Sequence, residues 1–169
     1  MEIKDQTKKI EMKLSEIRDY KVVKSNDLIQ KSRFQLSLQE QKINLYTTHK
    51  IKPDKKILME QEFKIIEFCR VCGIETNSGK NYKNVKDAIK ALADKSVWVT
   101  LETGSETLVR WINKAWINRK SGVIKIQLDD DMKPYLLQLQ ERFTSYELLY
   151  TLAMKSQYSV RLYELLKSY

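Results

Sequence analysis

Apolar side chains recur at helical spacing in several stretches of this sequence, and local capping signals mark where each stretch starts. Ser37 and Glu40 match a capping box, in which the serine accepts from an early amide and the glutamate reaches back. This predicts a helix over 38–50. Pro53 disfavours helical geometry at the residue before it and marks the exit of the chain. A short extended segment is predicted over 62–65.

A second helical stretch follows this segment. Ile66, Cys69 and Cys72 fall on one helical face, and Gly73 is placed to end the helix. The polar sequence over 74–81 then predicts a turn.

A third helix is predicted after this turn, with Asn81 as its cap. Three lysines, Lys83, Lys86 and Lys90, share one side of it. The opposite, buried side is predicted to consist of Val85, Ala88, Ile89, Leu92 and Ala93.

The period changes after this helix. Segments 97–102, 107–117 and 123–128 are rich in β-branched and aromatic residues, and turn-forming residues separate them at 103–105 and 118–122. The pattern predicts three strands joined as two consecutive hairpins.

Helical signals return in the last part of the chain. Pro134 is placed to begin a helical stretch, and Thr144 with Glu147 forms a second capping box. A closing helix is predicted with its apolar face made of Val160, Leu162, Tyr163 and Leu166.

The predicted order is helix, short strand, helix, turn, helix, strand, hairpin loop, strand. This is the order of a winged helix, here in an α+β domain with an additional strand and flanking helices. The turn before the third helix is longer than usual for this motif. We expect a flexible or weakly helical arm over 1–19 and one winged-helix domain over 20–169.

The charge of the chain suggests its type of partner. The formal net charge is +9, and 42% of the residues are hydrophobic without any apolar run of membrane-spanning length. No secretion signal is evident, so we expect a cytoplasmic protein without a membrane partner. A basic surface of this kind favours a nucleic acid, with a merely solubilising surface as the alternative. Residues 122–169 carry six basic and six acidic side chains, so the excess charge lies before them.

Catalytic and metal-binding motifs are weak. Cys69 and Cys72 form a C-x-x-C, but His49 is the only histidine, so a four-ligand zinc site lacks its remaining ligands. His49 is also expected at an exposed helix end without a motif around it. The glycines of 73–79 have the wrong spacing for a phosphate loop, and the acidic run 129–131 is better suited to a helix N-terminus. We expect no enzyme activity, cofactor, metal or small-molecule substrate.

Basic and amide side chains gather instead on the turn, the third helix and the hairpins. Lysines on one helix face are suited to hold a phosphate backbone, although Asp87 neutralises part of this stripe. The predicted phosphate contacts are Lys80, Asn81, Lys83, Asn84, Lys86, Lys90, Arg110, Lys114, Arg119 and Lys120.

Several stretches resemble a known family, the initiator replication proteins of iteron-containing, theta-replicating plasmids. The resemblance runs from "YKVVKSNDLIQKSRFQLSLQEQKINLY" through "NYKNVKDAIKALADKSVWV" and "LVRWINKAWINRKSGVIKIQL" to "PYLLQLQERFTSYELLYTLAMKSQYSVRLYELLKSY". It implies the N-terminal winged-helix domain of a bacterial initiator. Such proteins bind origin repeats in double-stranded DNA as monomers, recruit host replication factors, and act as homodimers in autorepression and copy-number control. The family continues into a second, base-reading domain, so we expect a fragment.

The resemblance also implies a dimer interface in this domain. An exposed sheet edge invites a partner strand, so we place the interface on the predicted strands. The residues chosen are Trp98, Val99, Leu101, Leu108 and Trp111. The alternative for Trp98, Trp111 and Trp116 is that they fill the core between sheet and helices. A rival functional hypothesis is a dimerisation and protein-interaction module with little DNA affinity of its own.

Overall fold

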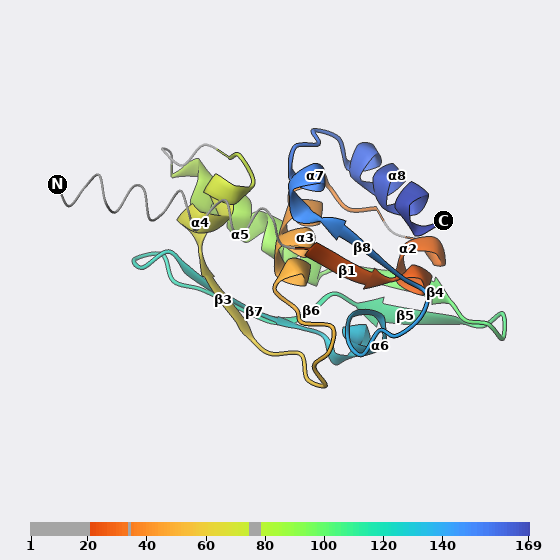
Figure 1. The fold of residues 1–169 in the computed structure, drawn as a ribbon. Coiled ribbons are helices and arrows are strands. Elements are labelled where there is room, and N and C mark those ends of the chain that lie inside the picture. The colour runs from red at the N-terminus through yellow and green to blue at the C-terminus, as the bar shows by residue number, and fades with distance from the viewer. Residues whose placement is uncertain (1–20, 34, 75–78) are drawn as a thin grey trace.

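The structure is a computed structural model that describes residues 21–33, 35–74 and 79–169 (Figure 1). The predicted arm and residues 75–78 of the predicted turn lie outside these residues. Three antiparallel sheets and their surrounding helices make up the described part.

The central unit has the predicted winged-helix order. Helix α3 (Leu38–His49) is followed by β3 (Gln61–Lys64), α4 (Ile65–Val71) and α5 (Lys80–Ala93). Strands β6 (Ile112–Ile117) and β7 (Val123–Leu128) then form the wing. They pair with β3 in the order β3-β7-β6, and α5 packs against both α3 and β6. The fold is therefore an α+β winged helix, as the sequence predicts.

The strand that directly follows α5 belongs to a different sheet from the wing. Strands β4 (Ser96–Thr100) and β5 (Glu106–Arg110) pair with the short β2 (Ser32–Arg33) in the order β2-β4-β5. The prediction of one strand over 107–117 is wrong, because the chain leaves one sheet and enters the other at Trp111. Its side chain is only 3% exposed, and its carbonyl accepts from the Asp129 amide at 3.1 Å. The two hairpin loops consequently lie at opposite ends of the molecule (Figure 1).

The third sheet joins the two ends of the described chain. Strand β1 (Lys21–Ser25) pairs with β8 (Phe143–Glu147), between the short helices α2 (Asn26–Gln30) and α7 (Leu148–Leu152). The capping box predicted at Thr144 is wrong, because this residue lies within β8. Its hydroxyl donates to the Asn26 side-chain oxygen at 2.5 Å.

The acidic run and Pro134 do mark a helical start. The Asp129 carboxylate accepts from the Asp131 amide at 3.0 Å, at the head of the 3-10 turn η1 (Asp130–Met132). Helix α6 (Lys133–Leu136) follows, and Pro134 lies in its first turn. The run therefore caps a helical segment, as predicted.

Helix α3 is the most buried helix of the domain. The rings of Tyr46 and Phe68 meet edge to face with centroids 5.3 Å apart, and Tyr46 is also 5.0 Å from His49. His49 is buried, which corrects its predicted exposure, and burial lowers its pKa to about 4. The Ser37 hydroxyl accepts from the Glu40 amide at 3.2 Å as predicted. Glu40 does not complete the box, because its carboxylate pairs with Lys95 at 2.7 Å.

The closing helix α8 (Gln157–Ser168) packs through a different face from the one predicted. Val160 is buried and Tyr163 is half-buried, but Leu162 is 56% exposed and Leu166 is also exposed. Glu164 is buried instead, and its carboxylate pairs with the buried Lys24 of β1 at 3.1 Å. Helix α8 therefore packs on the domain through this buried ion pair and Val160, and not through Leu162 and Leu166 as predicted.

Candidate nucleic-acid interface

Helix α5 separates a buried face from a basic face, as the sequence predicts. Lys80, Lys83, Asn84, Lys86 and Lys90 are all exposed. The side that faces the core consists of Val85, Ala88, Ile89 and Leu92, with Ala93 partly buried beside them.

The lysines of this helix differ in their local partners. The Lys90 ammonium lies 2.6 Å from the Asp94 carboxylate, which raises the pKa of Lys90 through a hydrogen bond and through charge attraction. Among the ion pairs between described residues, none joins Asp87 to Lys83 or involves Lys86. The positive charge of the α5 face is therefore concentrated toward the N-terminal half of the helix.

The tip of the wing approaches the N-terminal turn of α5. The Arg119 guanidinium lies over the Tyr82 ring, 5.8 Å from its centroid. A hollow of about 350 Å³ opens between the wing, the start of α4 and the start of α5. Its lining residues are Lys64, Ile65, Ile66, Cys69, Asn81, Tyr82, Arg119, Lys120, Ser121 and Gly122. Three predicted residues, Asn81, Arg119 and Lys120, thus meet here, and we name this site the wing hollow.

The wing loop that carries the two basic residues is ordered by hydrogen bonds within the loop. The Asn118 side-chain oxygen accepts from the Lys120 amide at 2.9 Å and from the Ser121 amide at 3.1 Å. Gly122 adopts a positive φ of 67°, a conformation that favours glycine. Its carbonyl accepts from the Ile65 amide at 2.8 Å, which ties the wing to the first residue of α4.

Two residues of the wing hollow differ from the sequence prediction. Lys64 was not among the predicted contacts, and it reaches the hollow only because β3 pairs with β7. Asn81 is not the helix cap, because α5 begins at Lys80 and its N-cap is Gly79, two residues before Asn81. The Asn81 side-chain nitrogen is buried, and it has no hydrogen-bond partner among the described residues.

Arg110 and Lys114 do not line the wing hollow. Arg110 ends β5 opposite Ser96, in the other sheet. Lys114 lies on β6, where its ammonium is 4.8 Å from the centroid of the Trp116 ring. Both side chains are exposed, but they lie apart from the place where the basic loop and α5 meet.

The residues predicted for dimerisation fall into two groups. Trp98 is 50% exposed and Leu108 is 48% exposed, and they are direct cross-strand partners on the outer face of β4 and β5. Leu101 is also exposed, and β5 is an edge strand. Val99 and Trp111 are buried in the core, so in this structure their side chains are not available to a partner. The alternative of a core role holds for Trp111, whereas Trp98 and Trp116 are exposed.

The predicted C-x-x-C thiols are both buried, and burial raises the pKa of Cys69. Ile66, predicted on the same helical face, is exposed at the wing hollow instead. Over the part of the chain that the structure describes, no group of three or more histidine, cysteine or acidic side chains is placed to hold a metal ion. The helices in these residues are also too short or too polar to cross a bilayer.

A family model matches most of the chain, and solved structures resemble its fold. Residues 21–167 match the family described as Initiator Replication protein, WH1. A similar solved structure is that of the Pi initiator protein in complex with iteron DNA, with a TM-score of 0.70 and 16% identity. That match covers 89% of this chain and 64% of the Pi chain, so this chain spans less than two thirds of that protein's length.

A second solved structure is the WH1 domain of MSBI1.176, a replication protein isolated from a multiple sclerosis patient. It matches with a TM-score of 0.42 and 18% identity, over 59% of this chain and 77% of that one.

Proposed function

The chain belongs to the Initiator Replication protein family, as a WH1 domain, and on this premise we propose that it binds DNA and dimerises within a plasmid replication initiator. In this role it acts at origin repeats in replication initiation, and as a homodimer in autorepression and copy-number control. Host replication factors are its further partners. It works by binding, without a catalytic residue, a cofactor or a small-molecule substrate.

The observation that carries this proposal is the meeting of the wing tip with the start of α5. Arg119 and Lys120 come from a loop that is hydrogen-bonded in place, and Lys64 comes from the end of β3. Cations from separate elements around one hollow are suited to neighbouring phosphates of a single strand. The Pi initiator protein was crystallised with iteron DNA, and we extend that class of ligand to this chain.

We choose the proposed phosphate contacts by the exposure of each side chain and by whether a carboxylate already pairs with it. Lys80, Lys83 and Lys86 extend the basic surface from the wing hollow along α5, with Asn81 and Asn84 as further donors. Lys90 contributes less because Asp94 holds its ammonium. Arg110 and Lys114 contribute less to DNA binding, because they lie away from the wing hollow. Phosphate contacts position a protein on DNA without reading its sequence, so we expect these contacts to bind duplexes of any sequence.

A titration of labelled duplex against salt tests the proposal. Each neutralised phosphate lowers the slope of log affinity against log salt by about 0.9, so we expect about −3 to −5 in all. Cognate and scrambled duplexes should behave alike. Absence of binding at low salt would contradict DNA binding by this chain.

The alternative function is a dimerisation module with little DNA affinity. The exposed pair of Trp98 and Leu108 on an edge hairpin favours it, because apolar side chains on an open sheet edge are suited to a partner strand. Sedimentation over a concentration series separates the two functions. A dimer that binds no duplex supports the alternative, and a strict monomer that binds duplex contradicts it.

A further inference from the structure

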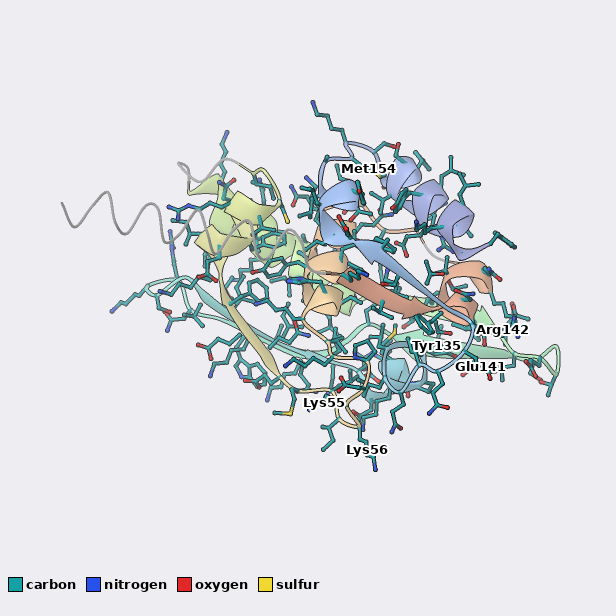
Figure 2. The ribbon with its side chains drawn as sticks, viewed as in Figure 1. Lys55, Lys56, Tyr135, Glu141, Arg142 and Met154 are labelled. Carbon is teal, nitrogen blue, oxygen red and sulfur yellow. The ribbon has the colours of Figure 1, made fainter. Side chains whose placement is uncertain are left out.

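A second basic hollow lies away from the wing, in the loop between α3 and β3. It has a volume of about 450 Å³. Its lining residues are Lys50, Ile51, Lys52, Lys55, Lys56, Ile57, Leu58, Met59 and Gln61, and we name it the lysine hollow. Figure 2 shows Lys55 and Lys56 near the lower edge of the molecule, while Met154 before α8 lies near the upper edge.

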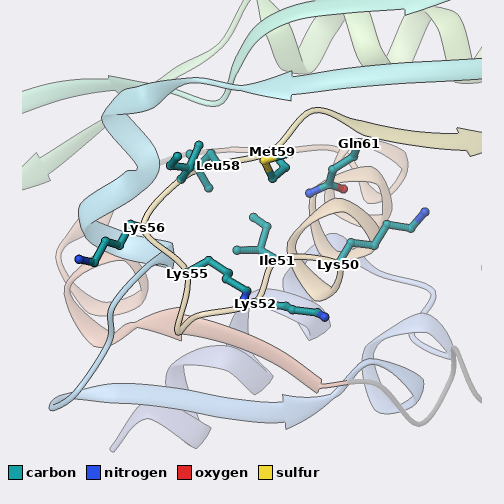
Figure 3. A pocket seen from close by; sticks show the side chains of 9 residues that line it. Lys50, Ile51, Lys52, Lys55, Lys56, Leu58, Met59 and Gln61 are labelled. Atoms are coloured by element: carbon teal, nitrogen blue, oxygen red, sulfur yellow. The ribbon is translucent and has the colours of Figure 1, made fainter.

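The lysine hollow combines an apolar interior with a charged rim. In Figure 3, Ile51 lies near the middle of the hollow with Leu58 and Met59 above it, and the lysine side chains lie along the lower side. Leu58 is buried, but Ile57 is 64% exposed and Met59 is 72% exposed. Ile57 and Met59 thus leave apolar side chains exposed to water at the edge of the hollow.

The charge on the rim has one sign. The Lys50 ammonium lies over the rings of Tyr46 and Phe63, 4.9 and 5.1 Å from their centroids. Lys52, Lys55 and Lys56 are exposed, and none of them takes part in an ion pair between described residues. Asp54 and Glu60 are exposed within the same loop, but neither of them is among the residues that line the hollow. The rim therefore complements an anionic ligand.

The backbone of the loop is held at several points. The Ile51 amide donates to the Thr48 carbonyl at 3.0 Å, and the Gln127 side chain donates to the Leu58 carbonyl at 3.1 Å. The Gln138 amide donates to the Pro53 carbonyl, which ties the loop to the segment after α6. A hollow formed before binding lowers the entropy cost of association.

We propose that the lysine hollow binds an acidic amphipathic segment of a partner protein. Leucine or phenylalanine side chains of that segment cover Ile57 and Met59 and enter the hollow, and its carboxylates meet Lys52, Lys55 and Lys56. A DNA duplex fits less well, because its backbone offers phosphates but no apolar groups to cover the two exposed side chains. The proposal does not depend on DNA binding at the wing hollow.

Fluorescence anisotropy with the labelled peptide DELDDFLEELDD tests this proposal on the full chain. Two control peptides separate the apolar from the electrostatic contribution to binding. DESDDSSEESDD keeps the charge without the apolar side chains, and NQLNNFLQQLNN keeps the apolar side chains without the charge. We expect the first peptide to bind at least about tenfold more tightly than either control, since both the apolar contacts and the charges contribute. Equal binding of the two charged peptides would overturn the proposal, because the hollow would then be only a polyanion surface.

Substitutions on the rim locate the binding. Lys55→Glu with Lys56→Glu should weaken the first peptide by about tenfold. Ile57→Ser with Met59→Ser should weaken it by a similar factor, about tenfold, without a change in charge. The matched control is Lys155→Glu with Lys167→Glu, which changes the net charge equally at exposed sites on α8 and just before it. A control that loses as much affinity as the rim variant would overturn the proposal.

A measurement on the unsubstituted chain avoids any effect of substitution on folding. Backbone NMR shifts on adding the peptide should concentrate at residues 50–61. Shifts confined to α5 and the wing would overturn the proposal. So would displacement of the peptide by an equal charge of scrambled duplex, or by vesicles of phosphatidylglycerol, because the hollow would then belong to a nucleic acid or a membrane.

Discussion

The two hairpins that follow α5 are chemical opposites. The β6–β7 loop carries Arg119 and Lys120 and closes on the basic start of α5. The β4–β5 hairpin carries the exposed pair of Trp98 and Leu108, and Glu102 and Glu106 lie at its far end. One continuous β-rich run of sequence therefore supplies a basic surface at one end, which we propose for phosphates, and an exposed apolar surface at the other, which we propose for a protein partner. Each surface can be altered without touching the other.

The residue that divides the two hairpins should matter most for stability. Trp111→Ala removes a buried indole at the point where β5 gives way to β6, and should lower the free energy of unfolding by about 3–5 kcal/mol. Urea denaturation measures this loss. Trp116→Ala is the matched control, because Trp116 is exposed on β6 and its loss should cost less than about 1 kcal/mol. Equal losses would mean that Trp111 does not anchor the division between the sheets.

Reversing the charge of the wing tip should separate DNA binding from self-association. Arg119→Glu with Lys120→Glu should reduce duplex affinity by about a hundredfold at low salt and make the salt slope shallower by about 2. Sedimentation should show unchanged self-association. Lys155→Glu with Lys167→Glu carries the same charge change away from the wing hollow and should have a much smaller effect. If both variants lose the same affinity, net charge and not the wing hollow governs binding.

The opposite experiment alters only the apolar hairpin. Trp98→Ser with Leu108→Ser removes the exposed cross-strand pair and should weaken self-association by about tenfold or more. Duplex affinity of the monomer should not change. Leu162→Ser with Leu166→Ser is the matched control, because it removes another exposed apolar pair from α8. Loss of the dimer in this control alone would move the interface from the hairpin to α8.

The sequence predicts features that local physics decides. The two faces of α5 are correct because a period of 3.6 residues over fourteen residues leaves little ambiguity. The Ser37 cap is correct because serine needs only the amide three residues ahead. The same S/T-x-x-E pattern at Thr144 is misleading, because β1, more than a hundred residues earlier in the chain, recruits that segment as a strand. Local pattern alone does not distinguish these two cases.

Features that depend on contacts between residues far apart in the chain could not be predicted from the sequence. The change of sheet at Trp111 has no local signal, since the whole run 107–117 is β-forming. Lys64 joins the wing hollow only through the register of β3 with β7. The packing of α8 depends on the ion pair of Lys24 with Glu164. A pattern of apolar residues does not reveal this pair, because both of its members are charged. The basic residues could be named from sequence, but not which of them converge.

The smallest expected effect concerns two lysines that look alike in sequence. Lys86 and Lys90 lie one helical turn apart on the exposed side of α5, but among the described residues a carboxylate partner, Asp94, pairs with Lys90 and none pairs with Lys86. Removing a cation that is already partly neutralised releases fewer counterions, so Lys90→Ala should weaken duplex binding by less than about twofold, and Lys86→Ala by about threefold. Asp94→Asn should raise the affinity slightly and restore the sensitivity to Lys90→Ala. If Lys86→Ala and Lys90→Ala weaken duplex binding equally, both in the unsubstituted chain and in Asp94→Asn, the ion pair of Lys90 with Asp94 does not affect the contribution of Lys90 to DNA binding.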